Sequence, residues 1–192
     1  MFDVSGVQWS ESHGVAGEHQ GAGALYFSLP YILQAKRCVC LGSGAGFVPL
    51  MMMSAQNRLI SEGVLDKTDV TLVDADIGIW GRPVYQSGEQ IHQDVRLIKK
   101  LTVDAVHELS DINYLHVDAD HSYEGVLADL ENYYPLMSGD WAITVHDTHN
   151  TSNQHLPIGS WKAAQEFTQK HNLSIMNFRV GCGTAVIRKT ND

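Results

Sequence analysis

Two apolar runs that each end in charged residues constrain the fold of this chain more than any other feature. Residues 115–117 lead into Asp118, and residues 141–145 lead, after one histidine, into Asp147. Between the runs, apolar side chains recur from Tyr123 onward with the spacing of one helix face. A strand, a helix and a second strand form a βαβ unit, whose crossover connection makes the two strands parallel.

Both runs become polar at their carboxyl ends, so their charged residues are expected on one edge of the sheet. In open α/β sheets that edge is where ligands bind. Asp118 and His121 follow the first run, and His146 and Asp147 follow the second. We therefore expect these four side chains to converge, although they are far apart in the sequence.

A glycine-rich turn stands between an apolar strand and a helix earlier in the chain. The strand covers residues 38–41, the turn covers Gly42 to Gly46, and the helix begins near Phe47. Glycines in such a turn let the backbone approach a ligand closely, and a plain tight turn is the alternative interpretation. The next strand, residues 70–73, leads into Asp74, the position that binds a ribose in nucleotide-binding folds.

The same two features disfavour a dinucleotide. Asp74 lies 32 positions after Gly42 (74 minus 42), whereas a dinucleotide site spaces them by about 20. The third glycine of the dinucleotide fingerprint is also absent, because Phe47 stands there. Both departures favour another adenosine-containing ligand over NAD.

The remaining pattern completes a layered sheet. A third strand is predicted over residues 95–98 and a short helix over residues 104–109. Ser160 is a candidate N-cap for a later helix, and residues 175–188 predict an antiparallel strand pair at the sheet edge. We predict an α/β fold that is doubly wound, with a mostly parallel seven-stranded sheet and an antiparallel last strand.

The N-terminal region shows less pattern. Residues 1–36 are expected to form an arm followed by a helix over residues 24–35, and the arm could act as a substrate lid. His13, Glu18, His19 and Gln20 are candidate substrate contacts, with a solvated arm as the alternative. Residues 37–192 are expected to form the ligand-binding domain. Within it, residues 78–94 form an irregular insertion, and Trp80, Arg82 and Tyr85 there either line the substrate or cover the core.

Composition limits the partners. The chain has 192 residues, which suits one domain, and a formal net charge of -9. This charge argues against nucleic acid or an anionic membrane as the main partner. No apolar run is long enough to span a bilayer, and the N-terminus lacks signal-peptide features. Cys38 and Cys40 are expected on opposite faces of one strand, and with Cys182 they indicate reduced thiols and a cytoplasmic protein.

Together these motifs resemble a class I S-adenosylmethionine-dependent methyltransferase from about residue 38 to residue 188. The glycine turn, the acidic end of the second strand, the Asp-ended strand and the terminal strand pair carry the resemblance. Its sharpest part is Val-Asp-Ala-Asp-His-Ser-Tyr-Glu-Gly-Val at 117–126 with Val-His-Asp-Thr at 145–148. This pairing resembles the subgroup of macrocin-type O-methyltransferases and cephalosporin-hydroxylase-like proteins, and more distantly catechol-type O-methyltransferases.

The resemblance implies a role for each site position. Gly42, Ser43 and Gly44 would lie against the methionine part of the cofactor, and Asp74 would bind the ribose hydroxyls. Asp118 would belong to both the cofactor and the metal site, with His146 and Asp147 as the other metal ligands. His121 falls where such enzymes place their general base. Some relatives carry an acidic residue where this chain has His146. Many relatives have Asp-Ser near the adenine, where this chain has Leu101-Thr102.

These roles fit the chemistry of methyl transfer to oxygen. A divalent cation on Asp118 and Asp147 would lower the pKa of an acceptor hydroxyl. Carboxylates suit Mg²⁺, and a ligand at His146 would extend the choice to Mn²⁺ or other transition metals. Neutral His121 would accept the proton. The expected function is therefore a metal-assisted O-methyltransferase that acts on a small-molecule acceptor, with a homodimer left open.

Alternative readings of the same residues remain open. Asp120 or His121 could only cap the following helix, as Ser122 could, and Asp118 could only bind loop amides. His146 could contact the metal ligands without binding the metal itself. Two other functions are compatible with the sequence: a metal-independent O- or N-methyltransferase, and a non-catalytic protein that binds the nucleoside cofactor.

Overall fold

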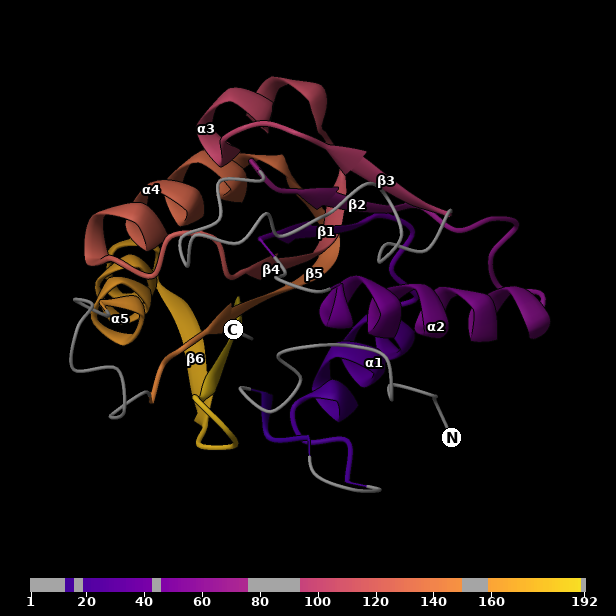
Figure 1. The fold of residues 1–192 in the computed structure, drawn as a ribbon, viewed down its shortest axis with the longest axis horizontal. Helices are drawn as coiled ribbons and strands as arrows, with labels where there is room; N and C mark the ends of the chain where they lie inside the picture. The colour runs from indigo at the N-terminus through magenta and orange to yellow at the C-terminus, as the bar shows by residue number, and fades with distance from the viewer. Residues whose placement is uncertain (1–12, 16–18, 43–45, 76–93, 150–158, 191–192) are drawn as a thin grey trace.

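The fold is taken from a computed structural model of the chain (Figure 1). The structure describes residues 13–15, 19–42, 46–75, 94–149 and 159–190. The predicted cofactor residues Ser43 and Gly44 lie outside these ranges. So do Glu18 and the three insertion residues that were expected near the substrate, Trp80, Arg82 and Tyr85.

A seven-stranded sheet forms the centre of the molecule, in the order β3-β2-β1-β4-β5-β7-β6. Neighbouring strands from β3 to β5 pair in parallel, and β7 is antiparallel to both β5 and β6. This confirms the predicted architecture, including the antiparallel last strand. The strands are β1 Cys38–Leu41, β2 Val70–Val73, β3 Val95–Ile98, β4 Ile112–Val117, β5 Met137–His146, β6 Leu173–Phe178 and β7 Thr184–Lys189.

Helices cover both faces of this sheet, with α1 and α2 on one side and α4 and α5 on the other (Figure 1). The α-helices are α1 Gly23–Ile32, α2 Phe47–Ser61, α3 Thr102–Ala105, α4 Tyr123–Tyr133 and α5 Ser160–His171. Two 3-10 turns follow α3 and α4, at η2 Val106–Glu108 and η3 Tyr134–Leu136. No described helix combines the length and apolar character needed to cross a membrane.

Alternate residues of each buried strand serve the two layers of the core. In β1, Val39 and Leu41 pack on the α4–α5 side, whereas Cys38 and Cys40 pack on the α1–α2 side. The expectation that the two cysteines face opposite ways is therefore wrong, because residues two apart in a strand share a face. Neither forms a disulfide among the described residues, in agreement with the expected reduced thiols.

The boundaries of α2 and α4 follow the predicted start and stop signals, but α1 ends at Ile32 and not near residue 35. The helix predicted over residues 104–109 is α3 followed by η2. Pro49 lies in the first turn of α2, and Gly63, with φ +73, follows its end. Ser122 caps α4 by accepting a hydrogen bond from the Gly125 amide. The predicted Ser160 cap is wrong, because Gly159 occupies the N-cap of α5 and Ser160 is the first helical residue.

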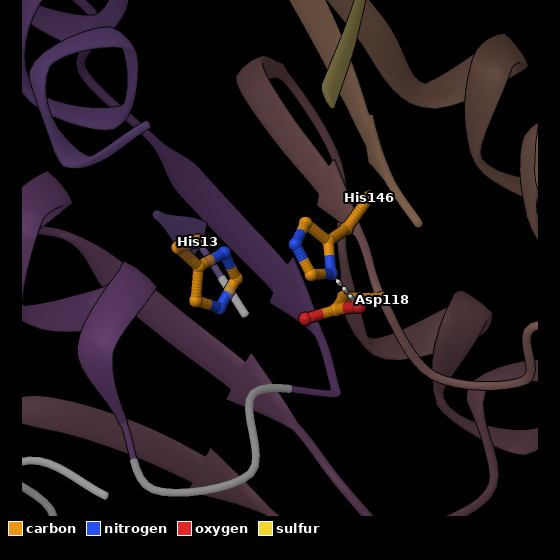
Figure 2. A group of neighbouring side chains, drawn as sticks. All are labelled: His13, Asp118 and His146. Atoms are coloured by element: carbon orange, nitrogen blue, oxygen red, sulfur yellow. Dashed lines mark hydrogen bonds and ion pairs between the residues drawn. The ribbon is translucent and has the colours of Figure 1, made fainter. Parts of the chain in front are cut away.

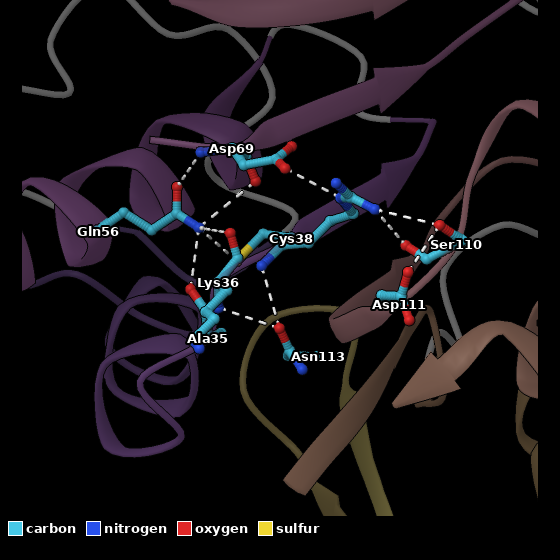
Figure 3. A network of polar contacts seen from close by, with 9 residues as sticks. Ala35, Lys36, Cys38, Gln56, Asp69, Ser110, Asp111 and Asn113 are labelled. Atoms are coloured by element: carbon cyan, nitrogen blue, oxygen red, sulfur yellow. Dashed lines mark hydrogen bonds and ion pairs between the residues drawn. The ribbon is translucent and has the colours of Figure 1, made fainter. Parts of the chain in front are cut away.

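A polar network fixes the amino ends of the central strands (Figure 3). The buried Gln56 side chain donates to the carbonyls of Ala35 (3.0 Å) and Lys36 (3.2 Å) and accepts from the Asp69 amide (2.7 Å). The side-chain Oδ1 of Asn113 accepts from the amides of Lys36 and Arg37. These bonds join the segments that enter β1, β2 and β4, so the strands start at a fixed level.

The strand register also aligns the carboxyl ends of the strands, at the opposite edge of the sheet. Leu41 pairs with both Val73 and Val117, and Val117 pairs with Val145. The four strands therefore reach the carboxyl edge at the same level. The residues that follow these positions are Gly42, Asp74, Asp118 and His146.

One buried carboxyl in the core gives a pH-dependent prediction. Asp129 of α4 is 3% exposed, and its Oδ2 has no hydrogen-bond partner among the described residues. Burial raises the pKa of this carboxyl to about 6, so its neutral form is favoured in the folded state. Its contribution to stability is fully present below the unfolded-state pKa of about 3.9 and is lost as the pH rises through about 6.

We therefore expect Asp129→Asn to be more stable than the wild type at pH 7 by about 1 to 3 kcal/mol. The gain should shrink toward zero at pH 4, where both side chains are neutral. Urea unfolding from pH 4 to pH 8 measures it, with the exposed Asp66→Asn as the control. A gain that does not change with pH would contradict the assigned burial effect.

Candidate functional site

The predicted site residues meet at the carboxyl edge of β4 and β5. Asp118 directly follows β4, His121 stands in the turn before α4, His146 ends β5, and Asp147 follows it. Asp147 has a left-handed backbone with φ +55, a conformation that aspartate tolerates better than most residues.

Asp118 lies at the centre of this group, with its side chain only 10% exposed. Its Oδ1 is 3.0 Å from Nδ1 of His146 and 3.4 Å from Nε2 of His121. Its Oδ2 is 3.7 Å from Nε2 of His116, which is longer than a hydrogen bond. Three imidazole rings therefore surround one buried carboxylate.

His121 bridges the two aspartates. Its Nδ1 lies 2.7 Å from Oδ2 of Asp147, and its Nε2 faces Asp118. Burial lowers the pKa of His121, but its hydrogen bonds to the two carboxylates outweigh that effect and raise the pKa to about 11. In this arrangement His121 is a cation at neutral pH.

The other charges in the group adjust to one another. Burial works against ionised Asp118, but His146, His116 and His121 together hold the pKa of its carboxyl well below the usual range. Burial also opposes a charged His146, yet the Asp118 carboxylate raises its pKa. Burial lowers the pKa of His13 and His116, so both are neutral imidazoles.

Two residues of the site were not predicted from the sequence as part of it. His116 is fully buried inside β4, where its Nδ1 bonds Thr144 Oγ1 at 2.8 Å. Tyr26 of α1 is fully buried and bonds Thr184 Oγ1 of β7 at 2.8 Å. The one available signal for His116 was a histidine inside an otherwise apolar strand run.

Two of the arm residues considered as substrate contacts, His19 and Gln20, lie outside this group in the described structure, while His13 lies within it. His13 is 3% exposed, and its ring centroid is 4.1 Å from that of His146 (Figure 2). The expectation of a solvated arm is therefore wrong at residue 13.

The capping alternatives for the turn before α4 are settled by its hydrogen bonds. Ser122, not His121, caps the helix, and Asp120 Oδ1 accepts from the Ser122 amide at 2.9 Å. His121 uses its main-chain carbonyl to accept from the Gly159 amide at 2.8 Å. The His121 imidazole takes no part in capping the helix and faces the two aspartates.

The donor set fits a divalent cation. Among the described residues, Asp118, His121 and Asp147 form one group whose ligand atoms lie within 4.8 Å of one another, and His13, Asp118 and His146 form another. The predicted ligand His146 also has its Nδ1 3.6 Å from Asp147 Oδ1. Metal bonds of about 2.0 to 2.2 Å place ligand atoms of one shell roughly 3 to 4 Å apart, so these spacings are compatible with a shared cation.

Two of the expected cofactor residues, Gly42 and Asp74, lie at the same edge. Gly42 has φ +67, and a Cβ there would meet the main chain of Asp118 and Ala119. The Gly42 amide donates to the Val73 carbonyl at 2.8 Å, and the Asp118 amide donates to the Leu41 carbonyl at 2.8 Å. Asp74 follows β2, whose last residue Val73 pairs with Leu41, so Asp74 and Gly42 follow neighbouring strand ends.

Residues 39–148 match the family model described as a methyltransferase domain. Among curated proteins, y4gI of Sinorhizobium fredii is 29% identical over 130 residues, which cover 62% of this chain and 14% of that protein. The chain thus spans about a seventh of the length of this relative.

Solved structures share the whole fold at low sequence identity. The methyltransferase PaMTH1 of Podospora anserina, bound to S-adenosylhomocysteine, has a TM-score of 0.64 at 12% identity and covers 96% of this chain and 83% of that chain. The O-methyltransferase TomG of Streptomyces achromogenes, in complex with S-adenosylmethionine, has a TM-score of 0.65 at 12% identity and covers 95% and 87%.

The close approach at Gly42 predicts a sensitive position. Gly42→Ala would force a strained backbone and a contact with the Asp118 main chain, so we expect a loss of about 2 to 4 kcal/mol in unfolding free energy. Gly63→Ala is a matched control, because Gly63 also has a positive φ but has open space around its Cα. It should lose only about 1 kcal/mol. Equal losses in urea unfolding would show that crowding at Gly42 has no effect.

Proposed function

Because the chain belongs to the methyltransferase-domain family and has the class I methyltransferase fold, we propose that it transfers a methyl group from S-adenosylmethionine to a hydroxyl group of a small molecule. The observation that carries this proposal is the shared edge of the sheet. Gly42 and Asp74 follow neighbouring strand ends at this edge, beside the aspartate–histidine group around Asp118, which supports their role in binding the cofactor. TomG, described as an O-methyltransferase in tomaymycin synthesis, supports oxygen as the methyl acceptor and a small molecule as substrate.

Each cofactor residue has a defined task in this proposal. S-adenosylmethionine would supply an electrophilic methyl group on its sulfonium. Gly42, with Ser43 and Gly44, would present backbone to its methionine part, because a side chain at residue 42 would collide with Asp118. The Asp74 carboxylate would accept hydrogen bonds from the ribose hydroxyls. These contacts would fix the donor beside Asp118.

Asp118, His146 and Asp147 would hold a divalent cation, either Mg²⁺ or Mn²⁺. The cation would supply positive charge that favours loss of the proton from the acceptor hydroxyl. The burial of Asp118 and Asp147 supports this role, because buried carboxylates need a compensating charge. The same burial keeps bulk water away from the two carboxylates, which strengthens each electrostatic contact they make.

His121 is the proposed general base. Asp147 holds its Nδ1 at 2.7 Å, so Nε2, with the longer contact of 3.4 Å to Asp118, is the atom that would receive the proton. While both carboxylates lie against its ring and no further cation is bound, the His121 imidazole stays protonated. Its action as a base therefore requires that another cation share the two carboxylates.

A metal-independent transfer is the second candidate, and one observation favours it. The His121 imidazolium already compensates both Asp118 and Asp147 without any further cation. In that case positioning of the acceptor against the methyl donor would supply the acceleration. The two candidates differ in their response to a chelator.

Isothermal titration with S-adenosylmethionine tests the cofactor assignment. We expect the wild type to bind, and Asp74→Asn to bind at least about tenfold more weakly, because a charge-assisted hydrogen bond to the ribose is weakened. Asp66 is exposed and precedes the amino end of β2, so Asp66→Asn is the control and should bind as the wild type does. No binding by the wild type, with or without Mg²⁺, would overturn the proposed function.

Release of S-adenosylhomocysteine with a panel of catechols, hydroxycinnamates and sugars then tests the transfer. Metal-assisted transfer should stop in EDTA and return when Mg²⁺ or Mn²⁺ is added. Transfer that EDTA leaves unchanged would support the metal-independent candidate instead. Cofactor binding without transfer to any acceptor would point to a non-catalytic binding protein.

A further inference from the structure

His13 is a buried histidine that the proposed transfer does not use. Its ring lies against His146, with centroids 4.1 Å apart, and against Phe47, with centroids 5.2 Å apart. Its carbonyl accepts a hydrogen bond from the Ala22 amide at 2.7 Å, which anchors residue 13 to the segment leading into α1. A buried imidazole is expected to have partners for its ring nitrogens, so His13 is expected to have a specific role.

We propose that His13, Asp118 and His146 form the ligand set of a divalent transition-metal ion, deeper in the molecule than the Asp118–Asp147 rim. One ligand atom from each of the three residues lies within 4.8 Å of the other two. Figure 2 shows the two imidazoles and the carboxylate facing one another from three different segments of the chain. The inference rests on the proposed function only in that both sites use Asp118 and His146.

A hydrogen-bonded chain orients His13 for this role. Its Nδ1 lies 3.0 Å from the Tyr26 hydroxyl, which lies 2.8 Å from Thr184 Oγ1. When Nδ1 donates to Tyr26 and Tyr26 donates to Thr184, Nε2 of His13 carries a free lone pair. Metal-bound histidines commonly donate their second ring nitrogen in this manner, which fixes the ring and its tautomer.

His116 supplies an independent observation that points to an ion at the same place. It is fully buried, and its Nε2 has no hydrogen-bond partner among the described residues. That atom stands 3.7 Å from Asp118 Oδ2, while Nδ1 is held by Thr144. A buried nitrogen without a partner beside a carboxylate is expected where an ion or a water completes a site.

The donor chemistry selects the class of metal. Two imidazoles and one carboxylate suit Mn²⁺, Fe²⁺, Co²⁺ or Zn²⁺, whereas Mg²⁺ prefers oxygen donors. With its Nδ1 donating to Tyr26, the His13 imidazole has the Nε2 lone pair to offer to a metal. The deep site would therefore favour a transition metal over Mg²⁺, and its ligand at residue 13 would join the N-terminal segment to β4 and β5.

Titration of the chelator-treated, full-length protein with Co²⁺ tests this inference by visible absorption and calorimetry. We expect Co²⁺ to bind at least about tenfold more tightly than Mg²⁺. His13→Gln should weaken Co²⁺ binding at least about tenfold and alter the absorption bands, while Mg²⁺ binding changes less than about twofold. The exposed His107→Gln is the matched control and should match the wild type.

Two measurements distinguish a failure of this site from a failure of the proposed function: the Co²⁺ spectrum of Asp147→Asn, and S-adenosylmethionine binding. If the deep site exists, Asp147→Asn keeps the Co²⁺ bands of the wild type. If His13→Gln binds Co²⁺ as the wild type does, the inference is wrong, and the proposed function stands as long as the same samples bind S-adenosylmethionine. If the wild type does not bind S-adenosylmethionine but its Co²⁺ binding depends on His13, the proposed function is wrong and the inferred metal site stands.

A spectroscopic measurement covers the case in which His13→Gln does not fold. Pulsed electron paramagnetic resonance of the wild type with one equivalent of Cu²⁺ counts the coordinated imidazoles through their remote nitrogens. Two imidazoles are expected, from His13 and His146. One or none would overturn the inference.

Discussion

A carboxylate buried among imidazoles is the interaction on which the site depends. Asp118 has little exposure and no lysine or arginine among its described charged contacts, so its charge is compensated by His146 and His121. A buried carboxylate without such partners would be strongly destabilising. The same arrangement makes the group responsive to added positive charge, because the protonated imidazoles can release their protons when a cation approaches the carboxylate. Structure and proposed chemistry therefore depend on one balance of charge.

The sheet makes this balance possible by aligning strand ends that are distant in sequence. Parallel pairing of β1 with β4 and of β4 with β5 places Gly42, Asp118 and His146 at one level. At the other ends of the strands, the Gln56 and Asn113 side chains hold the entering segments in register. A shift of one residue in β4 would turn Asp118 away from the edge and expose its apolar neighbours. The core and the site thus share the same register.

Much of this could be predicted from the sequence, and the failures have physical reasons. The strand–helix–strand pattern around Tyr123 and the polar strand ends predicted both the sheet and the convergence of Asp118, His121, His146 and Asp147. The sequence did not predict the charge on His121, because that depends on two carboxylates lying on either side of one ring. It named His13 only as a candidate substrate contact and did not place it against His146, since the glycine- and serine-rich segment around it has no period that would place it in space.

The central claim is that Asp118 holds a divalent cation beside a bound methyl donor. The most direct measurement is anomalous diffraction from a crystal of the full chain grown with Mn²⁺ and S-adenosylhomocysteine. Our account predicts a manganese peak bonded to the Asp118 carboxylate and to His146, on the side that faces the sulfur of the cofactor. A structure with the cofactor bound and Mn²⁺ in excess, but with no manganese at Asp118 and His121 still bridging the two aspartates, would contradict it.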